Sequence, residues 1–154
     1  MELARPDRHR SSQEGELSAP LGKAGEILQC VPDERRAWQA GPSRSWGRSH
    51  VNDFSIGIEL VNAQTGHDPF TDAQYRSLIA LTTDLVTRFH IPLRRITGHR
   101  NVTDFPSLKR DPANNFDWVR FLDGVRAMSA TKVVRRVIED QDAAAGNSGS
   151  VTSR

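Results

Sequence analysis

The clearest pattern of apolar and polar positions is the strict alternation in SIGIEL, residues 55–60. Its three large apolar residues fall on one face of the strand that the alternation predicts, whereas Glu59 falls on the other face beside Gly57. Because glycine has no side chain, a ligand has room next to the Glu59 carboxylate. The pattern therefore predicts a strand that packs on the core with one face and presents a carboxylate on the other.

Helical spacing of apolar residues predicts two helices after this strand. Residues 71–74, Thr-Asp-Ala-Gln, form a capping-box signal, and apolar residues recur at helical spacing from there to Phe89. Pro92 disfavours the helical conformation at the residue before it and so ends this helix. A second helix is predicted over residues 116–127, with an apolar face made of Trp118, Phe121, Leu122 and Val125.

Two shorter apolar runs, residues 26–31 and 96–98, predict further strands. Residues 33–53 show no periodicity and are expected to form a long ordered loop, anchored by Trp38 and Trp46. The order of elements is then strand, loop, strand, helix, strand, loop and helix. This order predicts an α/β or α+β fold in which helices pack on a small sheet.

The chain divides into three zones. Residues 1–24 are polar and carry none of the β-branched or aromatic residues typical of strands, so an irregular segment is expected. Residues 25–127 hold nearly all the periodic patterning and are expected to form the domain. Residues 128–154 are expected to form a short helix at 132–139 and then a disordered tail rich in Gly, Ser and Ala.

Composition sets limits without indicating a function. A chain of 154 residues fits one domain, and 21 basic against 19 acidic residues give a formal net charge of +2. This mild basic bias favours an anionic partner over a neutral one but does not indicate a nucleic-acid binder. The single cysteine, Cys30, excludes an internal disulfide, and no apolar run is long enough for a membrane span. Oligomeric state is not predicted.

The first residues lack the apolar segment of a secretory signal, so a cytoplasmic location is expected. A location outside the cell or at the cell wall is the alternative if the natural N-terminus differs.

Three residues around the end of the strand at 96–98 are candidates for chemistry. Asp111 follows His99 in the next loop, and Lys109 lies two residues before Asp111. Because Pro112 favours an extended backbone at Asp111, the side chains of Lys109 and Asp111 point roughly the same way. Imidazole and carboxylate groups are zinc ligands; Glu59 could then be a general base on a bound water, and Lys109 could stabilise an oxyanion. Spacing alone leaves the alternative that all are ordinary surface residues.

Five motifs extend this picture: RRAWQAG (35–41), NDFSIGIELVN (52–62), FTDAQY (70–75), ITGHR (96–100) and LKRDPANNFDW (108–118). In order and spacing they resemble the zinc-dependent N-acetylmuramoyl-L-alanine amidase family of the AmpD type, whose fold is shared with peptidoglycan recognition proteins. The resemblance implies a mixed β-sheet flanked by helices and a shallow cleft for peptidoglycan or a muropeptide. It also implies hydrolysis of the amide that joins the lactyl group of N-acetylmuramic acid to L-alanine of the stem peptide.

The resemblance implies roles for individual residues of this sequence. His99 and Asp111 match two zinc ligands of the family. Glu59 matches the glutamate that activates water, and Lys109 matches the lysine that stabilises the tetrahedral oxyanion. Zinc is therefore the expected cofactor, with Glu59 and Lys109 as the expected catalytic residues.

Three positions are expected to contact substrate. Trp38 and Asn52 match positions that line or shape the cleft. Gln39 stands where the family has a histidine, so hydrogen bonding is kept and a titrating group is lost. Ala113 replaces a glycine of the family pattern, which is a small change.

The main departure from the family concerns the first zinc ligand. The family carries it on a strand of the type Ser-x-His-Tyr, whereas residues 17–25 contain no histidine but do contain Pro20 and two glycines. This strand is therefore expected to be lost, and zinc binding to be impaired. His9 lies in a polar stretch without a strand pattern, and His50 in the tryptophan-rich loop is the conceivable substitute ligand.

Two functions compete on these observations. The first is a zinc amidase that acts on peptidoglycan, and the second is a non-catalytic module of the same fold that binds muropeptides. A truncated chain whose natural N-terminus lies elsewhere is a third interpretation. The presence together of Glu59, His99, Lys109 and Asp111 favours the enzyme, because binding alone does not require all four.

Overall fold

The computed structural model describes residues 1–4, 14–15, 19–33, 35–63 and 65–147. A four-stranded sheet has the order β3-β7-β1-β8, formed by Ala19–Leu21, Ser55–Leu60, Glu2–Ala4 and Ile96–Thr97 respectively. β1 runs antiparallel to both of its neighbours, whereas β3 runs parallel to β7, so the sheet is mixed as expected. Two separate pairs of short strands are β2 (Glu14–Gly15) with β4 (Arg36–Ala37) and β5 (Arg44–Ser45) with β6 (Arg48–Ser49).

β7 is the strand predicted from SIGIEL, and it has neighbours on both sides. Ile56 and Ile58 are buried in the core, whereas Glu59 is exposed. The backbone of Ile58 is bonded to Met1 in both directions: Ile58 N–H donates to the Met1 carbonyl at 2.9 Å, and the Met1 amino group donates to the Ile58 carbonyl at 2.7 Å. The predicted strand and its carboxylate-bearing face are therefore confirmed.

The expectation that residues 1–24 contain no strand is wrong. β1 lies between β7 and β8, and Leu3 is fully buried opposite Ile56. β3 lies at the edge of the sheet, where Pro20 is tolerated because an edge strand does not need every N–H for pairing. Strands of three residues are held by backbone pairing to a longer neighbour and need no alternating pattern of their own.

Two other local expectations also differ from the structure. Residues 26–31 do not form a strand; only Ile27 makes an isolated bridge, to Leu21, and Ile27 is 44% exposed. Trp38 and Trp46 are 47% and 38% exposed, so they do not anchor the loop at 33–53 by burial. A small apolar cluster does so instead, made of Ala40, Val51, Phe54 and Val102.

The first predicted helix is α1 (Asp72–Arg88), and its capping box is present. Thr71 Oγ1 accepts a hydrogen bond from Gln74 N–H at 3.1 Å, and Gln74 Oε1 accepts one from Thr71 N–H at 3.0 Å. Three single-turn 3₁₀ helices complete the loops: η1 (Val51–Asp53), η2 (Leu93–Arg95) and η3 (His99–Asn101).

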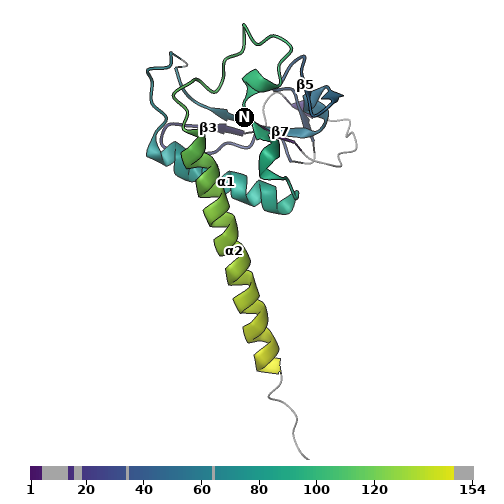
Figure 1. Cartoon of the computed structure of the whole chain (residues 1–154), viewed down its shortest axis with the longest axis vertical. Coiled ribbons are helices and arrows are strands. Elements are labelled where there is room, and N and C mark those ends of the chain that lie inside the picture. Colours follow the sequence, from purple (N-terminus) through teal and green to yellow (C-terminus); the bar gives the residue numbers. More distant parts are fainter. Residues whose placement is uncertain (5–13, 16–18, 34, 64, 148–154) are drawn as a thin grey trace, which may run out of the picture.

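α2 (Trp118–Asn147) is longer than predicted: the two helices expected at 116–127 and 132–139 are one continuous helix, and residues 140–147, expected in a disordered tail, are helical as well. Its first turns pack on α1, where Gly124 allows Ile79 to approach closely. The rest of the helix projects away from the body of the molecule, as Figure 1 shows, with Val133 and Val134 exposed. Neither a proline nor an internal glycine interrupts residues 125–145, so nothing in the sequence ends the helix where the prediction did.

The core lies between the sheet and the two long helices. Leu3, Leu21, Ile56 and Ile58 of the sheet belong to one buried cluster with residues of both helices, including Tyr75, Leu78, Leu85, Phe121 and Val125. None of the helices in the described part of the chain has the length and apolarity that a membrane span requires.

Candidate active site

One cleft, with a volume of about 330 Å³, brings most of the predicted site residues together. It is lined by β7, by the segment after β4, by the start of η3 and by the loop that follows. Six of the seven predicted site residues line it: Trp38, Gln39, Glu59, His99, Lys109 and Asp111. Asn52 does not line this cleft.

His99 and Asp111 lie in direct contact at one side of the cleft. His99 Nδ1 is 3.0 Å from Asp111 Oδ2, and Nε2 is 3.2 Å from the Ala40 carbonyl oxygen. Because a carbonyl only accepts, Nε2–H is the donor to Ala40, and Nδ1 is the nitrogen turned toward the carboxylate. His99 is only 8% exposed, and its imidazole is fixed from both sides.

A glycine makes this contact possible. A Cβ atom on Gly98, directly before His99, would lie 2.7 Å from Pro112 Cδ and 3.3 Å from the Asp111 carbonyl oxygen. Any larger residue at this position would push the loop with Asp111 away from His99.

The contact also changes the acidity of Asp111. Burial alone raises the pKa of its carboxyl group, but the hydrogen bond from His99 and the charge of the imidazole outweigh this effect, so the pKa lies below its ordinary value of 3.8. Asp111 is thus a carboxylate at neutral pH, as a metal ligand or an ion-pair partner must be.

Glu59 and Lys109 enter the cleft from different elements. Glu59 lies near the end of β7, and Lys109 lies at the end of a turn in which its N–H donates to the Phe105 carbonyl at 3.2 Å. Both residues are exposed and line the cleft, so both can reach a bound ligand.

Asn52 supports the cleft from behind. It is 2% exposed, and its Oδ1 accepts hydrogen bonds from Gln39 N–H at 3.2 Å and from Ala40 N–H at 2.8 Å. The carbonyl of the same residue, Ala40, accepts the hydrogen bond from His99 Nε2. The structure therefore gives Asn52 a part in shaping the cleft wall and in placing His99, without exposing it to a ligand.

Trp38 and Gln39 do face the cleft. The Arg36 guanidinium lies 3.7 Å from the centroid of the Trp38 ring, which covers one side of the indole. Gln39 lies across Gly57, and its Nε2 donates to Ser55 Oγ at 3.1 Å.

Comparison with known proteins identifies the family. The family model described as N-acetylmuramoyl-L-alanine amidase matches residues 5–114. The chain belongs to this amidase family.

Individual relatives agree with this assignment. The chain is 50% identical over 101 residues to the 1,6-anhydro-N-acetylmuramyl-L-alanine amidase AmpD of Citrobacter freundii, an alignment that covers 66% of the chain and 52% of the relative. The crystal structure of a selenomethionine derivative of AmpD superposes with a TM-score of 0.66 at 45% identity, covering 71% of the chain and 59% of that structure. The Escherichia coli amidase AmiD, solved with anhydro-N-acetylmuramic acid-L-Ala-D-gamma-Glu-L-Lys, gives 0.64 at 30% identity, covering 70% and 47%. The chain thus spans about half the length of the curated relatives it matches.

Zinc is the cofactor expected of an amidase of this family. The described residues of the cleft offer it the right kinds of ligand, but too few of them. His99 and Asp111 supply a nitrogen and an oxygen donor, and the carbonyl on His99 Nε2 is a typical support for a metal-binding histidine. Within the described residues, however, no three His, Cys, Asp or Glu side chains come together as a metal site. A catalytic zinc site uses three protein ligands and a water, so the described residues fall one short.

Of the two histidines considered as substitutes, the structure describes only His50, which does not fill this gap. His50 is exposed and directly precedes η1, with a backbone φ of 60°. It does not line the cleft. His9 lies outside the described residues.

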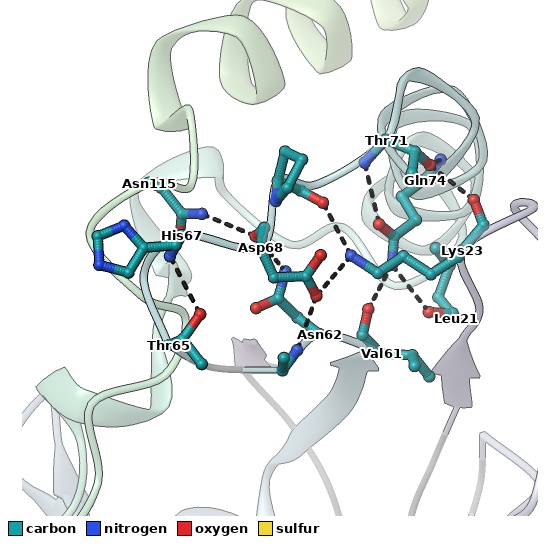
Figure 2. Close-up of polar contacts among 12 residues, drawn as sticks. Leu21, Lys23, Val61, Asn62, Thr65, His67, Asp68, Thr71, Gln74 and Asn115 are labelled. Atoms are coloured by element: carbon teal, nitrogen blue, oxygen red, sulfur yellow. Dashed lines mark hydrogen bonds and ion pairs between the residues drawn. The ribbon is translucent and has the colours of Figure 1, made fainter.

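Sequence reasoning missed several residues at the cleft. Met1, Asn62, Phe70 and Leu108 line it; the last three stand at the ends of recognised motifs, whereas Met1 gave no signal. The loop between β7 and α1, which carries Asn62 and Phe70, is held by a cluster of polar contacts around Asp68 (Figure 2).

Asp68 is the centre of that cluster. Its carboxylate pairs with Lys23 at 2.8 Å, and its carbonyl accepts hydrogen bonds from Asn62 Nδ2 at 2.7 Å and Asn115 Nδ2 at 2.8 Å (Figure 2). Asn115 belongs to the segment after Asp111, so these bonds join two loops that both contribute residues to the cleft lining.

Proposed function

We propose that this chain hydrolyses the amide between the lactyl group of N-acetylmuramic acid and L-alanine in muramyl peptides. The observation that carries the proposal is the convergence of Glu59, His99, Lys109 and Asp111 on one cleft. The names of the relatives and the ligand of the AmiD complex favour the 1,6-anhydro form of the sugar as the substrate. Turnover of intact wall is the weaker alternative.

Glu59 is the residue placed to move protons in this reaction. As a base it takes a proton from the attacking water while the oxygen bonds to the lactyl carbonyl carbon. It then returns the proton to the nitrogen as the C–N bond breaks, which releases the peptide with a free L-alanine amine and leaves a lactyl carboxylate. Lys109, as an ammonium group, stabilises the negative oxygen that forms in between.

His99 and Asp111 are the residues that would hold zinc. The chemistry that zinc would supply there is Lewis-acid polarisation of a water and a carbonyl. Because the described residues provide two ligands rather than three, we expect zinc to bind more weakly than in a complete site. Elemental analysis after dialysis against metal-free buffer tests this: less than one zinc per chain is expected, and one retained zinc per chain would contradict it.

Trp38 and Gln39 are placed to contact the sugar and peptide. Trp38 is 47% exposed and lines the cleft, so its indole ring can contact a sugar. Asn52 acts on the substrate indirectly, because its side chain holds the backbone of Gln39 and Ala40 in place.

The test follows cleavage of an anhydro-muramyl peptide by mass spectrometry. The wild-type chain should release the free peptide. Glu59→Gln should lower the rate by about 10²–10⁴-fold, the usual contribution of a general acid–base group, while binding of the muropeptide stays within about threefold of wild type because the shape of the residue is kept. Glu139→Gln is the matched control, because Glu139 lies on the projecting part of α2. Full activity of Glu59→Gln would remove Glu59 from this role.

The shortage of ligands favours one alternative, a muropeptide-binding module without turnover. Binding of the muropeptide by the wild-type chain, with no cleavage at any zinc concentration, would identify this function. A cytoplasmic location stays a prediction, which cell fractionation tests.

A further inference from the structure

Arg100, directly after His99, makes an unusual number of contacts with one segment of the neighbouring loop. Its Nη1 donates to Asn114 Oδ1 at 2.7 Å, and its Nη2 donates to the carbonyl oxygens of Arg110, at 2.7 Å, and Pro112. Its backbone N–H donates to the Asp111 carbonyl at 3.1 Å. One residue therefore contacts four of the five residues from 110 to 114.

These contacts surround Asp111 on both sides. The carbonyls before and after it are held by the guanidinium, and its own carbonyl is held by the Arg100 backbone. Since His99 and Arg100 are adjacent in η3, this arrangement ties the backbone of Asp111 to the backbone of His99.

The segment directly before Asp111 gives its backbone little support. Residues 104–110 are exposed, and the turn that leads to Lys109 is closed by bonds from Leu108 and Lys109 back to Phe105. Gly98 permits the close approach of Asp111 and Pro112, but a glycine supplies no attraction. The side chain of Asp111 is held by His99, and the backbone on both sides of it is held by Arg100.

We propose that Arg100 is a positioning residue that sets the distance between His99 and Asp111 and the placement of Lys109. The inference rests on the proposed function, because these side chains matter only if the cleft carries out the reaction. An arginine suits this task, since its planar guanidinium reaches several acceptors in fixed directions, whereas a lysine offers a single compact charge.

Three variants test the proposal in the full chain. Arg100→Ala removes all side-chain contacts, and Arg100→Lys keeps the charge without the planar fork. Asn101→Ala is the matched control: it lies in the same turn, and its side chain donates to Thr97 Oγ1 rather than to the 110–114 segment. Circular dichroism and thermal melts check that each variant is folded.

The first readout does not depend on activity. Hydrogen exchange by NMR follows the amide at position 100, which donates to the Asp111 carbonyl, together with the amides at 101 and 102, which donate to Gly98 and His99 inside the turn. Arg100→Ala and Arg100→Lys should speed exchange at position 100 by about tenfold or more and leave 101 and 102 unchanged, whereas Asn101→Ala should leave position 100 as in wild type. Unchanged exchange at position 100 would overturn the proposal.

The second readout separates kcat from KM in muramyl-peptide cleavage. Loss of a residue that orients a site group typically lowers activity by about 10–100-fold, so kcat should fall by this much in Arg100→Ala, less in Arg100→Lys, with KM within about twofold. Adding Asn114→Ala to Arg100→Ala should cause no further loss, because the bond that it removes is already gone. Faster exchange with an unchanged kcat would also overturn the proposal. If the wild-type chain cleaves nothing, the proposed function fails, and the exchange data alone decide whether Arg100 holds the loop.

Discussion

Replacing Gly57 by alanine tests whether Gln39 lies across β7 as the structure has it. A Cβ atom at Gly57 would lie 2.3 Å from Gln39 Cγ and 2.8 Å from Gln39 Cδ, far too close for carbon atoms. The Gln39 side chain must then move and give up the 3.1 Å hydrogen bond to Ser55 Oγ. Inserting a methyl group into a packed position costs about 1–3 kcal/mol. For a domain of this size, the melting temperature should fall by about 2–4 °C for each kcal/mol.

A double-mutant cycle isolates the contact. Gln39→Ala alone should cost about 0.5–1.5 kcal/mol for the lost hydrogen bond, but it also removes the Cγ and Cδ atoms that the new methyl group would meet. In that background Gly57→Ala should cost less than about 0.5 kcal/mol, which leaves a coupling free energy of at least about 0.5 kcal/mol between the two sites. Urea unfolding of the four proteins measures each free energy. Additive costs would show that Gln39 does not lie over Gly57.

Two further predictions concern buried and paired polar groups. Thr82 is fully buried, and its hydroxyl has no hydrogen-bond partner among the described residues, so Thr82→Val should raise the free energy of unfolding by about 1 kcal/mol; a lower urea midpoint would contradict this. The bonds from Lys23 and from the Ala63 N–H lower the pKa of Asp68 from its ordinary value of 3.8. A carboxyl group with a lowered pKa stabilises the fold above its unfolded-state pKa and loses this contribution as the pH falls through the folded-state value. Wild type should therefore be more stable than Asp68→Asn at pH 7, and the difference should disappear as the pH falls through the lowered folded-state pKa of Asp68; a gap independent of pH would refute the role of the ion pair.

The elements that the sequence predicts well are those with complete local signals. β7 has a full alternating pattern, and α1 has both halves of its capping box together with apolar residues at helical spacing. β1 and β3 have three residues each, and their partners lie about forty or more residues away in β7. Such strands form because the neighbouring strand offers free backbone groups, a property of the assembled sheet that no local window contains.

The candidate site divides in the same way. Glu59, His99, Lys109 and Asp111 lie in recognisable motifs, and the structure brings them to one cleft. The motifs placed Asn52 at the cleft but did not reveal how it acts there, because its hydrogen-bond donors are backbone N–H groups of another segment. Nor did they reveal the role of Arg100, although it stands inside one of the motifs. Its guanidinium donates to backbone carbonyl oxygens, and because every residue type has one, the sequence does not show which residues are its partners.

Backbone carbonyls in fact hold both sides of the His99–Asp111 pair. Ala40, itself fixed by Asn52, accepts from the imidazole, and the carbonyls on each side of Asp111 accept from the guanidinium of Arg100. Every residue type has a carbonyl, so the orientation of the pair survives changes at the positions that supply those carbonyls. The side chains of His99 and Asp111, the two potential zinc ligands, are consequently oriented in the metal-free protein. Little conformational entropy would then be lost when zinc binds. A weak affinity for zinc would then reflect the number of ligands rather than their orientation, and restoring one histidine to the sheet beside β7 should recover more affinity than any change around His99.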